Sequence, residues 1–291
     1  MDAIELLAGV IREAGYELHF SIFEVGALPM GEEPFYRLLD SFPGSRIVAF
    51  EPDERLCETQ NASTPAGVTF YPVALGRTEE QRDFYVTEHP MCSSLYPPNE
   101  ELLSRYNNME VARLKEITSV ATISLDRFVT EHGISCVDFI KIDIQGAELE
   151  VFQGGSATLA NVLAIVTEAE LIEHYVDQPL FGDVSAFLAS QGLQFQKFLG
   201  FGGRTLKPIV FDDNPSAVSQ QMWSDVLFIR DLFAVRKLSD EQYLKTAVLA
   251  MLYQCVDVAL YCCREVDLAS GSAIGQEFLQ RLQKAGDRSR G

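Results

Sequence analysis

Hydrophobic positions in this chain recur in two patterns that alternate along its length. Ile4, Leu7, Ala8 and Ile11 have the spacing of one helix face, whereas residues 136–140 form a short run that is apolar except for Asp138. Short apolar runs bounded by turn residues are typical of strands that are buried on both faces of a sheet. The alternation therefore predicts a strand and helix order in which crossover helices join parallel strands.

Seven strands and the helices between them can be placed from this alternation. The predicted strands are 18–25, 46–50, 68–73, 136–142, 162–168, 193–199 and 226–230, with a further edge strand at 82–87. The predicted helices are 4–15, 34–42, 54–61, 125–132, 147–153 and 183–191. Because no helix separates the last two strands, we expect an α/β fold with a mostly parallel sheet that an antiparallel hairpin closes.

The segment from about residue 87 to 120 departs from this order. It is polar, contains proline and tyrosine, and has only short helical pieces, which suits an active-site cover better than a scaffold. Tyr96 and Tyr106 are candidate platforms for a substrate ring, and Arg105 is a candidate contact for an anion. A purely stabilising role for these three side chains is the alternative.

The chain also changes character after residue 232. A capping-box sequence starts at Ser239, and an apolar stripe follows through a predicted long helix; its members are Leu244, Val248, Met251, Cys255, Val258 and Cys262. A shorter helix is predicted at about 273–285. We therefore expect a sheet domain at 1–232, which includes the N-terminal helix and the cover, and a C-terminal helical extension at 233–291. The stripe must be buried, either against its own domain or in a homodimer.

Composition narrows the class of protein. With 47% hydrophobic residues, the 291-residue chain can bury one large core. Its 42 Asp and Glu against 23 Lys and Arg give a net charge of −19, which argues against binding nucleic acid or an anionic membrane. No apolar run reaches the roughly 18 residues of a membrane span. The six cysteines have no metal-binding spacing, and the N-terminus has no signal-peptide pattern, so we expect a cytoplasmic protein with reduced thiols.

Functional residues are expected at the carboxyl ends of the predicted strands. Ligands of open α/β sheets bind beyond the carboxyl ends of the strands, and Asp143 directly follows the predicted strand 136–142. Asp143 is therefore either a site residue or the N-cap of the next helix. Gly26 and Gly31 follow the first strand and Glu51 ends the second, which is the layout of a nucleotide pocket. The turn is not GxGxxG, so an ordinary turn remains the alternative and a nicotinamide dehydrogenase is disfavoured.

Five sequence blocks, in order, resemble the FkbM family of S-adenosylmethionine-dependent methyltransferases. The blocks are VAFEPD at 48–53, VALG at 73–76, SSL at 93–95, SLD at 124–126 and FIKIDIQGAE at 139–148. The resemblance covers about residues 22–231. It implies a class I methyltransferase fold, which is Rossmann-like with seven strands and an antiparallel last strand. It also implies S-adenosylmethionine as cofactor and a hydroxyl group as methyl acceptor.

The resemblance also implies roles for residues at the strand ends. Glu24, Gly26 and Ala27 would line the methionine part of the cofactor, Glu51 would hold the ribose, Ala74 and Leu75 would lie near the adenine, and Asp143 would lie beside the transferring methyl. The first turn departs from the family pattern, because Glu24 replaces an aspartate, Leu28 replaces an asparagine and Gly31 comes one residue late. A non-catalytic protein that keeps the fold and binds a partner is therefore the alternative function.

A hydroxyl acceptor benefits from a base that can reach its proton. The catalytic candidates are Asp143, Glu168 and His174, with Glu170 beside them, because the predicted fifth strand ends at the same edge of the sheet as the fourth. A solvated strand end for the glutamates and an ordinary loop histidine are the alternatives. The same residues could hold a divalent ion, but we expect no metal. The sequence thus predicts O-methylation of a small molecule or sugar.

Overall fold

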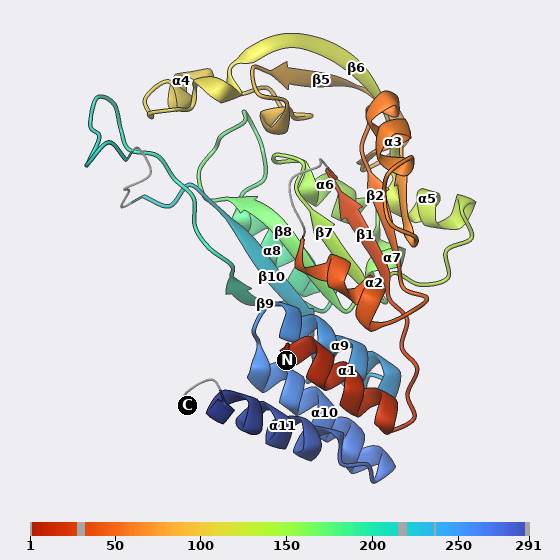
Figure 1. Cartoon of the computed structure of the whole chain (residues 1–291). Coiled ribbons are helices and arrows are strands. Elements are labelled where there is room, and N and C mark those ends of the chain that lie inside the picture. Colours follow the sequence, from red (N-terminus) through yellow and green to blue (C-terminus); the bar gives the residue numbers. More distant parts are fainter. Residues whose placement is uncertain (1, 28–32, 215–219, 236, 289–291) are drawn as a thin grey trace.

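The computed structural model describes residues 2–27, 33–214, 220–235 and 237–288, and its centre is a seven-stranded sheet (Figure 1). The strand order is β3, β2, β1, β7, β8, β10, β9. The bounds are β1 Ser21–Val25, β2 Arg46–Phe50, β3 Val68–Tyr71, β7 Phe139–Ile142, β8 Ala164–Glu170, β9 Leu193–Phe198 and β10 Trp223–Arg230. Strand β10 is antiparallel to β8 and β9, whereas the other pairs are parallel. The predicted class I methyltransferase fold is confirmed.

Helices cover both faces of this sheet because alternate residues of each buried strand point to opposite sides. In β1, Phe23 and Val25 face one core, and Ile22 faces the other. The Phe23 face packs on α5 Leu125–Glu131, α6 Glu148–Gln153, α7 Ser156–Leu159 and α8 Phe181–Ser190. The Ile22 face packs on α1 Ala3–Glu13, the 3-10 helix η1 Pro34–Arg37, α2 Leu38–Ser41, α3 Glu54–Asn61 and the C-terminal helices.

The C-terminal helices join α1 in a helical bundle, which we define as α1, α9 Asp240–Leu252, α10 Val256–Ser270 and α11 Ile274–Arg288. Figure 1 shows the bundle at one end of the sheet. The prediction of one long helix is wrong: Gln254 has a left-handed backbone (φ 60°) that ends α9, and α10 begins with Cys255 as its N-cap. The capping box at Ser239 is confirmed, since Ser239 and Gln242 exchange hydrogen bonds.

The apolar stripe of the bundle is covered by the chain itself. Leu244, Val248 and Cys262 are buried in the same core as Phe139 and Ile229 of the sheet. A polar contact adds to this core, because Lys245 Nζ lies 3.1 Å from Asp138 Oδ1. The first alternative for the stripe is therefore the one found, while a homodimer and the domain boundary at 232 stay predictions. Among the described residues, no helix is both long and apolar enough to span a membrane.

A second sheet lies above the carboxyl edge of the first, and we call it the cover sheet. It consists of β4 Ala74–Gly76, β6 Leu114–Ser124 and β5 Glu80–Thr87 in this order, with the short helices η2 Pro90–Cys92, α4 Glu100–Leu103 and η3 Glu110–Ala112 between β5 and β6. The predicted strand 82–87 is thus an edge strand of the cover sheet. Strand β6 was not predicted, because most of its residues are exposed and leave no buried alternation.

Candidate active site

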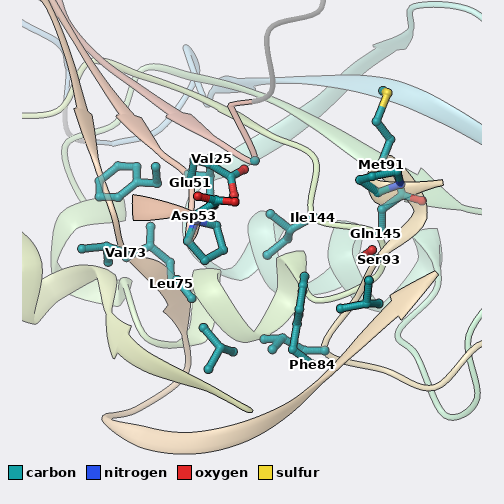
Figure 2. Close-up of a pocket in the computed structure, with 18 of the residues that line it drawn as sticks. Val25, Glu51, Asp53, Val73, Leu75, Phe84, Met91, Ser93, Ile144 and Gln145 are labelled. Atoms are coloured by element: carbon teal, nitrogen blue, oxygen red, sulfur yellow. Dashed lines mark hydrogen bonds between the residues drawn. The ribbon is translucent and has the colours of Figure 1, made fainter. Parts of the chain in front are cut away.

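A cavity of about 460 Å³ lies between the carboxyl edge of the main sheet and the cover sheet. Figure 2 shows side chains from both sheets facing this space. Its sheet-edge lining comes from the ends of β1, β2 and β7, and its roof comes from β5, β6 and residues 90–95. Binding crevices of open α/β sheets lie at this edge, so the cavity is the expected position for a ligand.

Glu51 places a buried carboxylate on the cavity wall. It directly follows β2, and one of its oxygens, Oε1, accepts a hydrogen bond of 3.0 Å from the backbone N–H of Asp53. Burial raises the pKa of Glu51, and the backbone hydrogen bond opposes this rise. Asp53 in turn caps α3 by accepting from Arg55 N and Leu56 N. The turn after β2 therefore holds Glu51 in a fixed position, where it can accept hydrogen bonds from a ligand's hydroxyl groups.

Gly26 allows the turns after β1 and β7 to touch. Its backbone is left-handed (φ 79°), and a Cβ at this position would lie 2.0 Å from the carbonyl oxygen of Asp143. Only glycine fits such an approach. The N–H groups of Gly26 and Ala27 both donate to Phe50 O at 3.1 Å, which fixes this turn against β2. The close approach brings the two predicted site turns into a single wall.

The predicted cofactor residues divide into two groups. Gly26, Glu51, Ala74, Leu75 and Asp143 all line the cavity. Glu24 and Ala27 do not line it.

Ala27 is buried in the core, and Glu24 Oε2 accepts a hydrogen bond of 2.7 Å from Tyr36 OH. Burial raises the pKa of Glu24 to about 7 despite this hydrogen bond. The departures at Leu28 and Gly31 lie outside the described residues. The described part of the first turn therefore presents Gly26 to the cavity and turns the acidic side chain away from it.

Asp143 lies on the cavity wall and does not cap the following helix, whose N-cap is Ala147. Lys141 Nζ lies 3.7 Å from Asp143 Oδ2 and 3.0 Å from Asp225 Oδ1. Burial alone would lower the pKa of Lys141. The negative charges of Asp143 and Asp225 outweigh this effect, so the pKa of Lys141 is raised above its usual value. Lys141 is therefore a buried cation that lies near the carboxylates of both Asp143 and Asp225.

Glu168 and Asp143 both accept hydrogen bonds from the side-chain amide of Gln145. The Gln145 side chain donates from Nε2 to Asp143 Oδ1 at 2.9 Å and to Glu168 Oε2 at 2.5 Å. Burial and then the charge of Asp143 raise the pKa of Glu168 well above its usual range. The predicted convergence of the fourth and fifth strand ends is thus found: one amide joins Asp143, which lines the cavity, to Glu168, which lies behind it.

Two further glutamates lie behind this pair and are fully buried. Glu148 accepts from the N–H groups of Ile144 (2.8 Å) and Gly146 (3.0 Å), so it fixes the turn that carries Gln145. Burial raises the pKa of Glu148 to about 7. Glu170 is also buried, which raises its pKa strongly, and it does not line the cavity. Of the two glutamates for which a solvated strand end was the alternative, Glu170 is buried and Glu168 is hydrogen-bonded to Gln145.

His174 lies away from the cavity. Its ring packs edge-on against Trp223 with 5.6 Å between centroids, and burial lowers its pKa to about 4. His174 is therefore a neutral buried side chain, and the structure does not bring it to Asp143. Within the described ranges, no three His, Cys, Asp or Glu side chains converge as metal ligands.

The cover residues chosen from the sequence make contacts within the protein. Tyr96 OH donates to Glu150 Oε1 at 2.5 Å, Tyr106 OH donates to Gln220 Oε1 at 2.8 Å, and Arg105 pairs with Glu101. None of the three predicted side chains lines the cavity. The roof is instead formed by side chains such as Phe84, which Figure 2 shows pointing toward the sheet edge.

Sequence reasoning assigned no role to Gln145, Lys141 or Asp225. The first two stand within the FIKIDIQGAE block, so they were visible but not singled out. Their importance comes from contacts with positions on β8 and β10, which no local pattern shows. The roof residues on β6 had a weak signal, since Ile117, Thr118, Val120, Thr122 and Ile123 are β-branched residues of the kind enriched in strands.

Comparisons with known proteins place the chain in a family. The model of the methyltransferase FkbM domain matches residues 24–195, which is more than half of the 291 residues. Among curated proteins, 2-O-methyltransferase NoeI of Sinorhizobium fredii is 30% identical over 154 residues. That match covers 50% of this chain and 59% of the relative, so it spans less than two thirds of the relative's length.

Two solved structures are similar at low scores. A SAM-dependent methyltransferase from Aquifex aeolicus has 12% sequence identity and a TM-score of 0.31, with 78% of this chain and 92% of that chain covered. Human methyltransferase-like protein 13, in complex with SAH, has 12% identity and a TM-score of 0.34, with 87% and 89% covered. Because both scores are low, the fold rests on the sheet order described above.

Proposed function

We propose that this chain, which belongs to the FkbM methyltransferase family, transfers a methyl group from S-adenosylmethionine to a hydroxyl oxygen of a small molecule or sugar. One observation carries the proposal: the buried carboxylate of Glu51, the Gly26 turn and Asp143 line one cavity at the carboxyl edge of the sheet. The name of the curated relative, a 2-O-methyltransferase, supports oxygen as the acceptor atom.

The residues of the cavity fit a nucleoside cofactor. Glu51 can accept hydrogen bonds from both ribose hydroxyls, since its backbone partner occupies only Oε1. Ala74 and Leu75 add an apolar surface on which an adenine can pack. Gly26 lines the cavity where the methionine part would lie, and its missing side chain lets the turn after β1 touch that of Asp143. Bound here, the cofactor would supply an electrophilic methyl group on a sulfonium.

Methyl transfer to a hydroxyl group requires the protein to align the reacting atoms and to provide a proton acceptor. The acceptor oxygen forms a bond to the methyl carbon while the carbon–sulfur bond breaks, and the hydroxyl proton goes to a base. Asp143 is the base candidate on the cavity wall, and the ammonium of Lys141 lies 3.7 Å from its Oδ2. Glu168, whose pKa is raised, is better suited to hold a proton beside it.

One observation favours the second candidate, a non-catalytic protein with the same fold. The carboxylate of Glu24 is bonded to Tyr36 and lies off the cavity, so it is not placed to meet a cofactor's amino group from there. The two functions differ in a simple measurement. A methyltransferase must bind S-adenosylmethionine, whereas a partner-binding module that has lost the cofactor does not.

Calorimetric titration with S-adenosylmethionine and S-adenosylhomocysteine tests the proposal. We expect both to bind, and we expect Glu51→Ala to weaken binding about 10- to 100-fold, the loss of hydrogen bonds to a charged group. Glu54→Ala is the matched control, because Glu54 is exposed in the first turn of α3 and does not line the cavity. No binding by the wild-type protein at millimolar ligand would refute the proposal.

A further inference from the structure

Gln145 is the point where three parts of the site meet. It follows β7, lines the cavity, and adopts a left-handed backbone (φ 58°), which is uncommon for a residue other than glycine. Such a conformation persists where surrounding contacts determine it. Here Glu148 supplies those contacts by accepting from the N–H groups on both sides of Gln145, those of Ile144 and Gly146. The turn therefore directs the Gln145 side chain away from the helix and toward β8.

The chemistry of an amide suits the two carboxyl groups that Gln145 contacts. Its NH₂ group has two hydrogens, one for Asp143 Oδ1 and one for Glu168 Oε2, at 2.9 and 2.5 Å. A glutamate here would add a third negative charge, and an aliphatic side chain would leave both carboxyl groups without this donor. The neutral donor thus permits two carboxyl groups to lie together.

Gln145 is also bonded to the segments that approach from the cover side. Tyr175 OH lies 2.8 Å from Gln145 Oε1 and 2.8 Å from Cys92 O, so it stands between the amide and the cover loop. Ser94 Oγ donates to the backbone carbonyl of Gln145 at 2.6 Å. Tyr175 is almost fully buried, which restricts the orientation of its hydroxyl. The orientation of the amide is therefore linked to the position of residues 92–94.

We propose that Gln145 is a positioning residue, which holds Asp143 at the cavity wall with Glu168 beside it and links the pair to the cover through Tyr175 and Ser94. The inference rests on the proposed function, because it concerns the groups that would receive the acceptor's proton. Gln145 itself takes no proton in this scheme. It sets the relative acidity of the two carboxyl groups, so that one of them can act as base.

Other charged groups also act on this pair from the neighbouring elements. Lys141 on β7 and Asp225 on β10 lie on one side, Glu170 follows along β8, and Glu148 and Tyr175 approach from α6 and the loop after β8. The charges of Glu170 and Glu148 oppose ionisation of Glu168. The test must therefore compare titrations in which Lys141, Asp225, Glu170 and Glu148 stay unchanged.

Carboxyl carbon NMR on protein labelled at Asp and Glu side chains gives that comparison, with Asp143→Asn and Glu168→Gln variants used to assign the two signals. Gln145→Leu removes both donors at similar volume. Gln145→Glu keeps the shape and replaces the donor by a negative charge. Gln194→Glu controls for the added charge, since Gln194 is exposed on β9.

We expect the titration midpoint of Glu168 to rise by about one pH unit in Gln145→Leu and by more in Gln145→Glu, because the ionised form loses its donor and then gains a like charge. Gln194→Glu should leave the midpoint unchanged. Tyr175→Phe, which keeps the ring and removes one hydroxyl, should raise the midpoint of Glu168 less than Gln145→Leu does. This variant keeps the test open if the Gln145 variants do not fold.

The inference would be overturned if Glu168 titrated with the wild-type midpoint in folded Gln145→Leu and Tyr175→Phe. A glutamine with a purely structural role would change the melting temperature of the protein but not the titration midpoint of Glu168. The outcome is separate from that of the proposed function. Binding of S-adenosylhomocysteine to the wild-type protein, measured in parallel, decides the function. Binding with unchanged midpoints refutes the role of Gln145 alone, and shifted midpoints without binding refute methyl transfer alone.

Discussion

The cover sheet and the helical bundle are both additions to the same central sheet, yet they are attached in different ways. The bundle shares a continuous apolar core with the sheet, in which Leu244, Val248 and Phe139 are fully buried. The cover sheet reaches the main core through Leu75 of β4 and Ile123 of β6, but its outer part, β5 and most of β6, is attached mainly by polar contacts. Arg82 Nη1 lies 2.7 Å from Glu150 Oε2 on α6, Tyr96 OH donates to the same carboxylate, and most of β6 is exposed.

The two kinds of attachment have different consequences for the stability of the protein and for access to its cavity. Apolar burial is non-directional and large in sum, so the bundle contributes to global stability. Isolated polar contacts contribute little each, so segments held by them open more easily than the core. The cavity lies under the second kind of attachment. A ligand can therefore enter by local opening of the cover sheet while the main core remains folded.

The largest effect is expected at the joint between the bundle and the sheet. Lys245→Met should lower the free energy of unfolding by about 3–5 kcal/mol, because Asp138 is then left buried without its cation. Urea denaturation followed by circular dichroism measures this loss. Lys237→Met is the control, since Lys237 is mostly exposed beside Glu265 and its loss should cost less than about 1 kcal/mol. Equal losses in the two variants would contradict the assignment of the bundle to the main core.

A smaller and more local effect is expected in the cover sheet. Arg82→Gln should reduce the opening free energy of β5 by about 1–3 kcal/mol, because the buried carboxylate of Glu150 loses its charged partner. Native-state hydrogen exchange of the β5 amides should then quicken roughly tenfold or more, while amides of β1 remain unaffected. Arg127→Gln, which breaks an exposed ion pair with Glu131, is the matched control. Faster exchange throughout the main sheet would show that the cover sheet does not open separately.

The smallest effect is a response of the cover sheet to acid. Burial tends to raise the pKa of Glu150, but its hydrogen bonds with Arg82 and Tyr96 lower it below the usual 4.5. A depressed pKa contributes stability that is present above about pH 4.5 and is lost as pH falls through the folded-state pKa. We expect amide signals of β5 to shift on acidification in this range. In Glu150→Gln this step should be absent, and its persistence would assign it to another group.

Most of the main sheet could be predicted because its strands are buried runs between turn residues. The runs at 46–50 and 136–142 are visible in the sequence for this reason. Strand β6 was missed because it pairs within an exposed sheet, where no core imposes a pattern. The helix break at Gln254 was missed because the apolar stripe continues across it, as both α9 and α10 bury one face.

The only residues of the candidate site that could be predicted are those that directly follow buried strands. Glu51 and Asp143 follow buried strands, so the sheet edge brings them to one cavity whatever the loops do. His174 and Gln145 depend on side-chain directions within loops, which strand and helix patterns do not determine. The structure turns His174 toward Trp223 and turns Gln145 toward Glu168.

The packing of α1 in the bundle has a consequence for biosynthesis. Its apolar face is made well before that of its partners α9 and α11, which begin at Asp240 and Ile274. Tyr16 OH bonds to Asp240, and Arg281 pairs with Glu13, so contacts of very long sequence separation join the two ends. Chains fold from the N-terminus as they emerge from the ribosome, and unpaired apolar surface favours aggregation. Ile4, Leu7 and Ile11 therefore lack these partners until α9 and α11 have been made, and chaperones are expected to shield them during synthesis.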